Sequence, residues 1–155
     1  DGDGFVATKV INGRLYSFVY TFNAADETLS FRYDQEPTSY VFTSWFADFI
    51  NTEFLTKKSL TTAIPELPLD GAEQYVVDLT LDDFFSYDNV QIVISGDHST
   101  AWAAALTGGN YVVETDENGD TYYLSADGKI AIYSDYDEDS DSTYAIIYAT
   151  ADFEE

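Results

Sequence analysis

The clearest pattern in the chain is the alternation of apolar and polar residues between positions 110 and 149. It divides into four short segments, separated by Asn118-Gly119, by Asp127-Gly128 and by an acidic loop from Asp135 to Asp141. Asn-Gly and Asp-Gly accept the positive φ angles of type I′ turns, which join paired antiparallel strands. The pattern therefore predicts a four-stranded meander.

The last strand of this meander, from Thr143 to Ala149, is apolar on both of its faces. Such a strand is expected at the centre of a sheet or under a cover. At the edge of a sheet it would instead offer a surface for pairing with another chain. The sequence leaves both positions open.

Alternation also predicts three antiparallel strands near the start of the chain, at 5–11, 14–22 and 29–33, with a tight turn at Asn12-Gly13. In the second strand a period of two places four aromatic residues on one face. They are Tyr16, Phe18, Tyr20 and Phe22. We interpret this stripe as a buried face covered by a helix, rather than as a ligand platform.

The spacing of apolar residues becomes helical after Pro37. Phe42, Trp45, Phe46, Phe49 and Ile50 recur at intervals of three and four, which places them on one face of a helix. We expect this helix to be capped by Thr38 or Ser39, to run to about Leu55 and to lie on the aromatic face of the first sheet.

The middle of the chain is predicted to contain an extended linker at 59–71, two paired strands at 75–82 and 90–95, and a short alanine-rich helix at 100–106. The fold class expected is α+β and mostly antiparallel β. It is either a β-sandwich or a curved sheet of about eight to nine strands with one main amphipathic helix packed on it. The whole chain, residues 1–155, is expected to form a single β-rich domain.

The charge of the chain is strongly negative. It carries 29 acidic and six basic residues, for a formal net charge of −23. This charge repels nucleic acid and anionic membranes, and it attracts cations and basic partners. No apolar run approaches the ~20 residues that a membrane span requires, so we expect no span.

The chain contains neither cysteine nor methionine. Without cysteine it has no disulfide, no thiolate nucleophile and no thiolate metal site. The sequence begins at Asp1 without an initiator methionine, which we interpret as removal of a signal peptide rather than trimming. The expected location is therefore extracellular or at the cell surface.

Two acidic segments are candidates for calcium binding, because calcium prefers several carboxylate and carbonyl oxygens on a flexible loop. The candidate ligands are Asp135, Asp137, Asp139 and Asp141 in one segment, and Asp116, Asn118 and Asp120 in the other. Neither segment matches the EF-hand loop, which needs glycine at its sixth position and glutamate at its twelfth. Counted from Asp135, these positions hold Ser140 and Ile146. A solvated acidic hairpin tip is the alternative interpretation.

No catalytic group stands out in the sequence. The single histidine, His98, is adjacent to Ser99, but the glycines of a nucleophile elbow are absent and no second histidine is present. We interpret Asp97-His98-Ser99 as a loop that caps the following helix. The chain is therefore not expected to be an enzyme.

These observations favour a secreted structural protein that assembles outside the cell, as a subunit of a filament, tube or matrix with an acidic and calcium-binding surface. Its partners would be further copies of itself or components of the cell surface or matrix. A carbohydrate- or ligand-binding module that uses tyrosine and tryptophan faces is the alternative. A third hypothesis is an acidic inhibitor or immunity-type protein that blocks a basic site.

Overall fold

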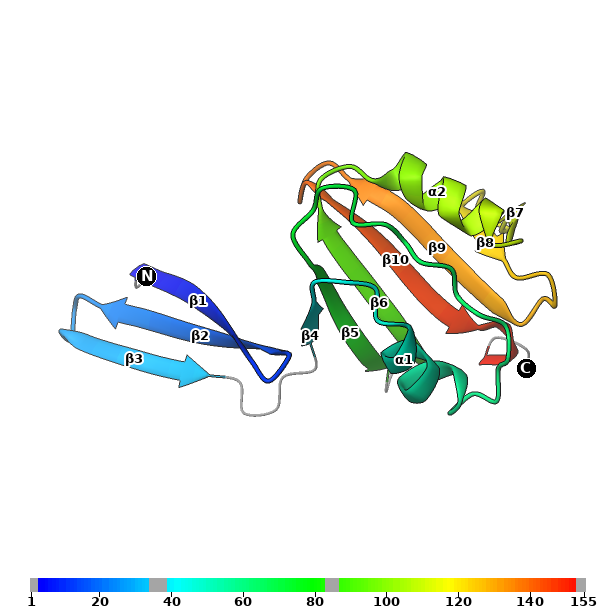
Figure 1. Ribbon diagram of the computed structural model, residues 1–155. Helices are drawn as coiled ribbons and strands as arrows, with labels where there is room; N and C mark the ends of the chain where they lie inside the picture. Colours follow the sequence, from blue (N-terminus) through cyan, green and yellow to red (C-terminus); the bar gives the residue numbers. More distant parts are fainter. Residues whose placement is uncertain (1–2, 34–38, 83–86, 153–155) are drawn as a thin grey trace. The chain divides into compact units, whose positions relative to one another are not determined.

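The computed structural model describes residues 3–33, 39–82 and 87–152 (Figure 1). It contains ten strands in antiparallel pairing and two short α-helices, which confirms the expectation of a sheet-rich α+β protein with slightly more strands than predicted. The chain divides into two compact units, unit 1 (Asp1–Val41) and unit 2 (Phe42–Glu155). The single-domain organisation of residues 1–155 stays a prediction.

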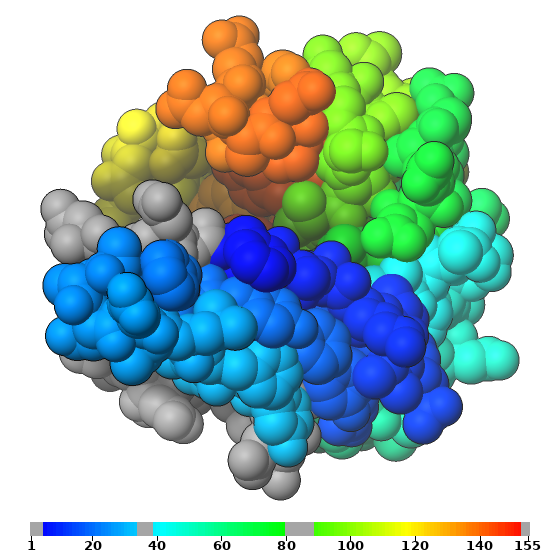
Figure 2. Space-filling model, turned by 90° about the vertical axis from the view of Figure 1, so that its left-hand side faces the viewer, coloured from blue at the N-terminus to red at the C-terminus, as the bar shows by residue number. Residues whose placement is uncertain are grey.

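Unit 1 is built on three antiparallel strands, β1 (Asp3–Ile11), β2 (Arg14–Asn23) and β3 (Thr28–Tyr33). Strand β2 lies between β1 and β3 (Figures 1 and 2). Asn12 and Gly13 have φ angles of 53° and 77°, the combination that a type I′ turn requires. The predicted hairpin is therefore present with its two-residue turn.

Unit 2 contains a sheet with the strand order β5-β6-β10-β9-β8-β7. The predicted meander is present as β7 to β10, and β10 lies between β6 and β9. The apolar final strand is therefore central, because β6 and β9 occupy both of its edges. The strands are β5 (Tyr75–Asp82), β6 (Tyr87–Ser95), β7 (Val112–Thr115), β8 (Thr121–Leu124), β9 (Ile130–Asp137) and β10 (Ser142–Ala149).

The core of unit 2 lies on one face of this sheet. The two helices, α1 (Ala47–Ile50) and α2 (Ser99–Gly108), lie on that face together with a coil at 56–74 (Figure 1). Strands contribute alternate residues to this core, which the register brings side by side, for example Ile92 next to Ala145. The fully buried strand residues include Val77, Val90, Ile92, Ile130, Ile132, Ala145 and Ile147, and the helix and coil add Trp102, Leu106 and Leu67.

The expected main amphipathic helix is not confirmed. The helical segment begins at Ala47 rather than near residue 39, and it continues after Ile50 as a π-helical turn over Asn51–Leu55. Its aromatic neighbour Phe46 packs edge-on against Tyr75 of unit 2, with ring centroids 5.3 Å apart. The segment is thus anchored on β5, whereas the sequence predicted that it covers the first sheet.

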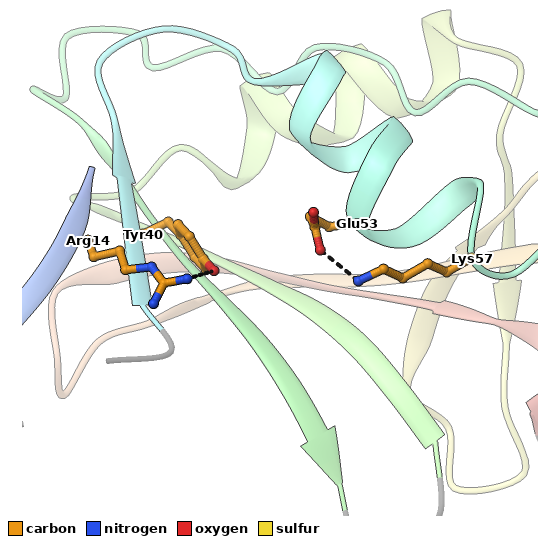
Figure 3. A network of polar contacts seen from close by, with 4 residues as sticks. All are labelled: Arg14, Tyr40, Glu53 and Lys57. Carbon is orange, nitrogen blue, oxygen red and sulfur yellow. Dashed lines mark hydrogen bonds and ion pairs between the residues drawn. The ribbon is translucent and has the colours of Figure 1, made fainter. Parts of the chain in front are cut away.

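The helix begins late because the preceding residues form strand β4 (Ser39–Phe42). The backbone N–H of Val41 donates to the carbonyl of Gly13 at 2.8 Å. Arg14 donates to the hydroxyl of Tyr40 at 3.1 Å and lies over the ring (Figure 3). These contacts hold an extended backbone at Ser39, one of the two predicted helix caps, and the other cap, Thr38, lies outside the described residues.

The predicted linker at 59–71 contains neither helix nor strand, and its ends at 59 and 70–71 are turns. Three side chains of unit 2 donate hydrogen bonds to its backbone. The hydroxyl of Tyr75 donates to the carbonyl of Leu67 at 2.6 Å, and the indole N–H of Trp102 donates to Pro68 at 2.9 Å. The hydroxyl of Tyr111 donates to Ala63 at 3.3 Å. Burial, with a smaller contribution from Glu66, raises the pKa of Tyr75 to about 12, so this donor keeps its proton at physiological pH.

Candidate functional site

The first candidate calcium segment forms the hairpin tip between β9 and β10. Asp135 and Asp137 lie at the C-terminal end of β9, and residues 138–141 form the turn. The carboxylate of Asp137 accepts the N–H of Asp139 at 3.0 Å and the hydroxyl of Ser140 at 2.8 Å. These bonds lower the pKa of Asp137, with the Ser140 bond the larger cause.

Asp141 is the last acidic residue of this tip, and its carboxylate contacts the side chain of Tyr136. It accepts the hydroxyl of Tyr136 at 2.9 Å. Backbone N–H and hydroxyl groups of the hairpin thus compensate part of the negative charge of these carboxylates, for which the sequence suggested a bound cation. The hairpin is ordered by these contacts within its own tip.

The second segment, between β7 and β8, is organised by one carboxylate. Oδ1 of Asp116 accepts the backbone N–H groups of Asn118 at 2.8 Å and of Asp120 at 2.9 Å. Oδ2 accepts the hydroxyl of Tyr133 at 3.0 Å. Only Gly119 of the predicted Asn118-Gly119 turn has a positive φ angle, so the connection is a longer loop rather than a type I′ turn.

Among the residues that the structure describes, no three acidic or histidine side chains come together in an arrangement that could hold a metal ion. The calcium sites at residues 116–120 and 135–141 therefore stay predictions.

The loop before α2 is arranged as a turn rather than as a catalytic triad. The carboxylate of Asp97 accepts both the N–H and the hydroxyl of Ser99, at 3.1 Å and 2.7 Å. The Nε2 atom of His98 lies 2.9 Å from the carbonyl of Ser95. The hydroxyl of Ser99 is thus engaged by Asp97. The N-cap residue of α2, His98, makes no side-chain hydrogen bond to the helix, so the predicted capping role of this loop is not confirmed.

Unit 1 exposes large apolar side chains on both faces of its three strands. Phe5 and Val6 are each 63% exposed, and Leu29 is 67% exposed. The aromatic rings on one face stack across the strands, as Phe5 does with Tyr20 at 4.7 Å between centroids. A three-stranded sheet with so much exposed apolar surface is typical of an interaction site. The other exposed members of this surface are Val10, Ile11, Phe22, Phe31 and Tyr33.

Strand β1 also has an unpaired edge. It is nine residues long, and β2 is its partner along its whole length. Within the described residues no strand pairs with its other side. The two-residue turn makes Ile11 and Arg14 a hydrogen-bonded pair, so alternation directs the backbone N–H and C=O groups of Val6 and Thr8 away from β2. A long apolar edge of this kind is a template for strand addition.

Unit 2 carries a hollow of about 530 Å³ on the face of its sheet opposite to the core. The register across the strands places Leu124, Ala131, Tyr148 and Asn89 in one row. Tyr133, Ile146 and Gln91 form the next row, and the ring of Tyr122 packs against that of Tyr133 at a tilt of 36°. Asp116 and Thr150 complete the lining.

The three tyrosines of this hollow form a connected group. The ring of Tyr133 lies 5.4 Å from that of Tyr122 and 5.6 Å from that of Tyr148. Burial, followed by a hydrogen bond with Tyr133, raises the pKa of Tyr148, and burial raises the pKa of Tyr133. The phenols of Tyr133 and Tyr148 therefore keep their protons at physiological pH, while hydrogen bonds led by the N–H of Asp120 lower the pKa of Asp116 and keep it ionised.

Sequence reasoning did not identify this hollow. The sequence showed the alternation that brings Tyr144, Ile146 and Tyr148 to one face, but not which strands lie beside them. The pairing of β10 with β6 joins residues 47 to 59 positions apart, for example Tyr148 with Asn89. A pairing of that sequence separation leaves no local signal.

Comparison with known proteins identified no relative of this chain. No protein-family model matches the chain, and neither the curated proteins nor the solved structures searched contain a match. Within the described residues no helix has the length and apolar character needed to cross a membrane. The function is therefore argued from the surfaces of the two units.

Proposed function

We propose that the chain is a structural subunit that self-associates outside the cell by strand addition through β1. The observation that carries this proposal is the unpaired nine-residue edge of β1, flanked by apolar side chains that are exposed on both faces of the strand. Backbone hydrogen bonds along the edge supply affinity, and the alternate side chains supply the register.

The distribution of charge supports a second copy as the partner. Unit 1 carries six acids and three bases, for a formal charge of −3, whereas unit 2 carries the other 23 acids and three bases, for −20. Two copies that meet through unit 2 would repel each other strongly. A meeting through unit 1 avoids most of that repulsion.

The sequence of β1 also contains a self-complementary register. In an antiparallel pair of two β1 strands, alignment of Val6 with Val6 of the second copy places the position of Asp3 opposite Lys9. The same alignment sets Phe5 opposite Ala7, a large residue against a small one. It also pairs Gly4 with Thr8, whose backbone groups point to the free edge.

Thr8→Pro is the variant that tests the edge. It removes the outward N–H of Thr8, and proline is tolerated at edge positions whose N–H faces solvent. We expect sedimentation velocity to show association of the natural chain and a monomer for T8P, with unchanged circular dichroism. Leu29→Lys, which alters an exposed face of β3 and not the edge, is the control and is expected to associate.

Divalent cations are expected to strengthen this association, because they screen the charge that the two copies bring together. The same sedimentation experiment with calcium, with magnesium and with a chelator measures that effect. A natural chain that stays monomeric at every concentration, with or without calcium, contradicts the proposal.

The carbohydrate-binding alternative that depends on tryptophan finds little support in the positions of the two indoles. Trp102 is fully buried and donates to Pro68. Trp45 packs against Phe46 and Tyr75, with ring centroids 4.8 Å and 5.8 Å away. The inhibitor hypothesis depends on a basic target protein and stays a prediction.

A further inference from the structure

We propose that the hollow lined by Tyr122, Tyr133 and Tyr148 is a binding site for a small organic cation, an ammonium group carried on a ring or another apolar body. The site lies within unit 2 and on the sheet face opposite to the core. It is separate from the β1 edge, so the proposal goes beyond the assembly function.

The first observation is an amide without a partner. Asn89 is only 6% exposed, and its Oδ1 atom is buried without any hydrogen-bond partner. Buried polar atoms in folded proteins are nearly always paired, since a missing partner is costly to stability. Asn89 lines the hollow, so a turn of its amide toward the hollow would let a ligand that donates a hydrogen bond satisfy this atom.

The second observation is the sign of the charge around the hollow. Its lining contains the carboxylate of Asp116 and no lysine, arginine or histidine. Unit 2 as a whole has a formal charge of −20. An anionic ligand is repelled by this field, and a cation is attracted to it.

The third observation is the aromatic wall. Tyr122, Tyr133 and Tyr148 are half-buried and lie on three neighbouring strands, with Tyr148 one row away from Tyr133 in the register. The face of an aromatic ring attracts an ammonium group, and the attraction increases where water is excluded. Ala131 leaves the floor of the hollow open, because its side chain is small between Leu124 and Tyr148 in the register.

Together these groups define the occupant. An ammonium ion donates hydrogen bonds, which suits Asn89 and Asp116, and it carries the charge that the field selects. A neutral sugar would use the amide and the rings but would gain nothing from the carboxylate charge. A cation therefore uses the amide of Asn89, the carboxylate of Asp116 and the aromatic rings together.

The test uses three probes that share one ring and differ in charge: benzylamine as the cation, benzyl alcohol as the neutral probe and benzoate as the anion. Each is titrated into the full chain and followed by NMR chemical shifts of the tyrosine rings. We expect saturable binding of benzylamine, binding of benzyl alcohol about tenfold weaker and no binding of benzoate. Preferred binding of the neutral cellotriose, or an absence of saturable benzylamine binding, overturns the proposal.

Matched variants separate this site from general attraction to an acidic surface. Asp116→Asn removes a charge at the hollow and keeps an oxygen for the turn, whereas Asp120→Asn removes the same charge from the same loop outside the hollow lining. We expect D116N to weaken benzylamine binding about tenfold and D120N to leave it unchanged. Equal effects of the two variants overturn the proposal.

Two further variants, Asn89→Leu and Ala131→Leu, distinguish a role of the hollow in ligand binding from a purely structural role. N89L replaces the unpartnered amide by an apolar group of similar size, so it should raise the melting temperature while it weakens binding. A131L fills the hollow and keeps every charge. Retention of benzylamine affinity in both variants contradicts the site.

Discussion

At the scale of single residues, a few carboxylates and aromatic hydroxyls fix the connections of unit 2. Asp127 is one of them, because it joins the coil to the turn between β8 and β9. It accepts the hydroxyl of Thr62 at 2.5 Å and that of Ser125 at 2.7 Å. These two bonds, with smaller contributions from Lys129, hold the pKa of Asp127 below its ordinary value.

This lowered pKa predicts how stability depends on pH at Asp127. A carboxyl whose pKa is lower in the folded state stabilises the fold above its unfolded pKa of about 3.9 and loses that contribution as the pH falls through the folded pKa. Urea unfolding at constant ionic strength should therefore show a natural chain more stable than Asp127→Asn at pH 6. The difference should shrink as the pH falls below about 4.

Asp139→Asn is the control for this measurement, because the Asp139 side chain has no partner among the described residues. Its effect on the free energy of unfolding should be smaller and should not carry the same pH profile. A difference between the natural chain and D127N that is constant from pH 6 to pH 3 contradicts the role assigned to Asp127.

The indole of Trp102 is a second residue-scale determinant. It is fully buried, and its N–H satisfies the carbonyl of Pro68 in the coil. Trp102→Phe should cost about 1–3 kcal/mol, since it removes both the hydrogen bond and part of the buried ring. The free energy of unfolding in urea measures this, and a loss below about 0.5 kcal/mol contradicts it.

At the scale of elements, the end of α2 and the coil show how closely the layer over the sheet is packed. Gly108 and Gly109 are adjacent and neither has a positive φ angle. A Cβ atom at Gly108 meets no atom within 4 Å, whereas one at Gly109 would lie 2.8 Å from Cγ of Pro65. The helix end and the coil are therefore in direct contact at Gly109.

Alanine substitutions at these two glycines should therefore change the free energy of unfolding in opposite directions. Gly108→Ala should raise the free energy of unfolding by up to about 1 kcal/mol, because alanine favours the helix. Gly109→Ala should lower it by about 1–3 kcal/mol, since the ring of Pro65 must move. Thermal unfolding of the pair measures both effects, and equal shifts of the two variants contradict the packing described.

Elements with local signals could be predicted from the sequence, and those set by distant contacts could not. The Asn12-Gly13 hairpin and the meander of β7 to β10 follow from alternation and turn residues. Strand β4 was mistaken for helix, because Phe42 fits the helical spacing while Tyr40 finds its partner in Arg14. The candidate hollow depends on the pairing of β6 with β10, which no local pattern specifies.

At the scale of the whole molecule, charge sets the conditions under which the chain folds and associates. The net charge of −23 comes mostly from unit 2. Against this charge, Lys58 pairs with Asp152 at 2.9 Å and Lys57 pairs with Glu53 within a helical turn (Figure 3), while the whole chain has only six basic residues for its 29 acids. Repulsion between carboxylates is therefore largely uncompensated.

Salt should stabilise the fold as a result. Sodium chloride screens repulsion in the compact state more than in the extended chain, and a gain of about 1 kcal/mol corresponds to about 2–4 °C in melting temperature for a chain of this size. The combined variant Glu138→Gln and Asp139→Asn, which removes two charges from the hairpin tip, should respond less. A melting temperature that falls with added salt contradicts this account.

The central claim is that two copies join through β1 in the register that places Val6 opposite Val6, and a cross-link tests it most directly. The chain contains no cysteine, so Val6→Cys introduces a single thiol. A short thiol cross-linker should give a covalent dimer on a denaturing gel, since directly opposed Cβ atoms lie about 4.5–5.5 Å apart. The control Ser30→Cys, on β3, should remain monomeric. Equal cross-linking of both variants, or none with V6C, would contradict strand addition through β1.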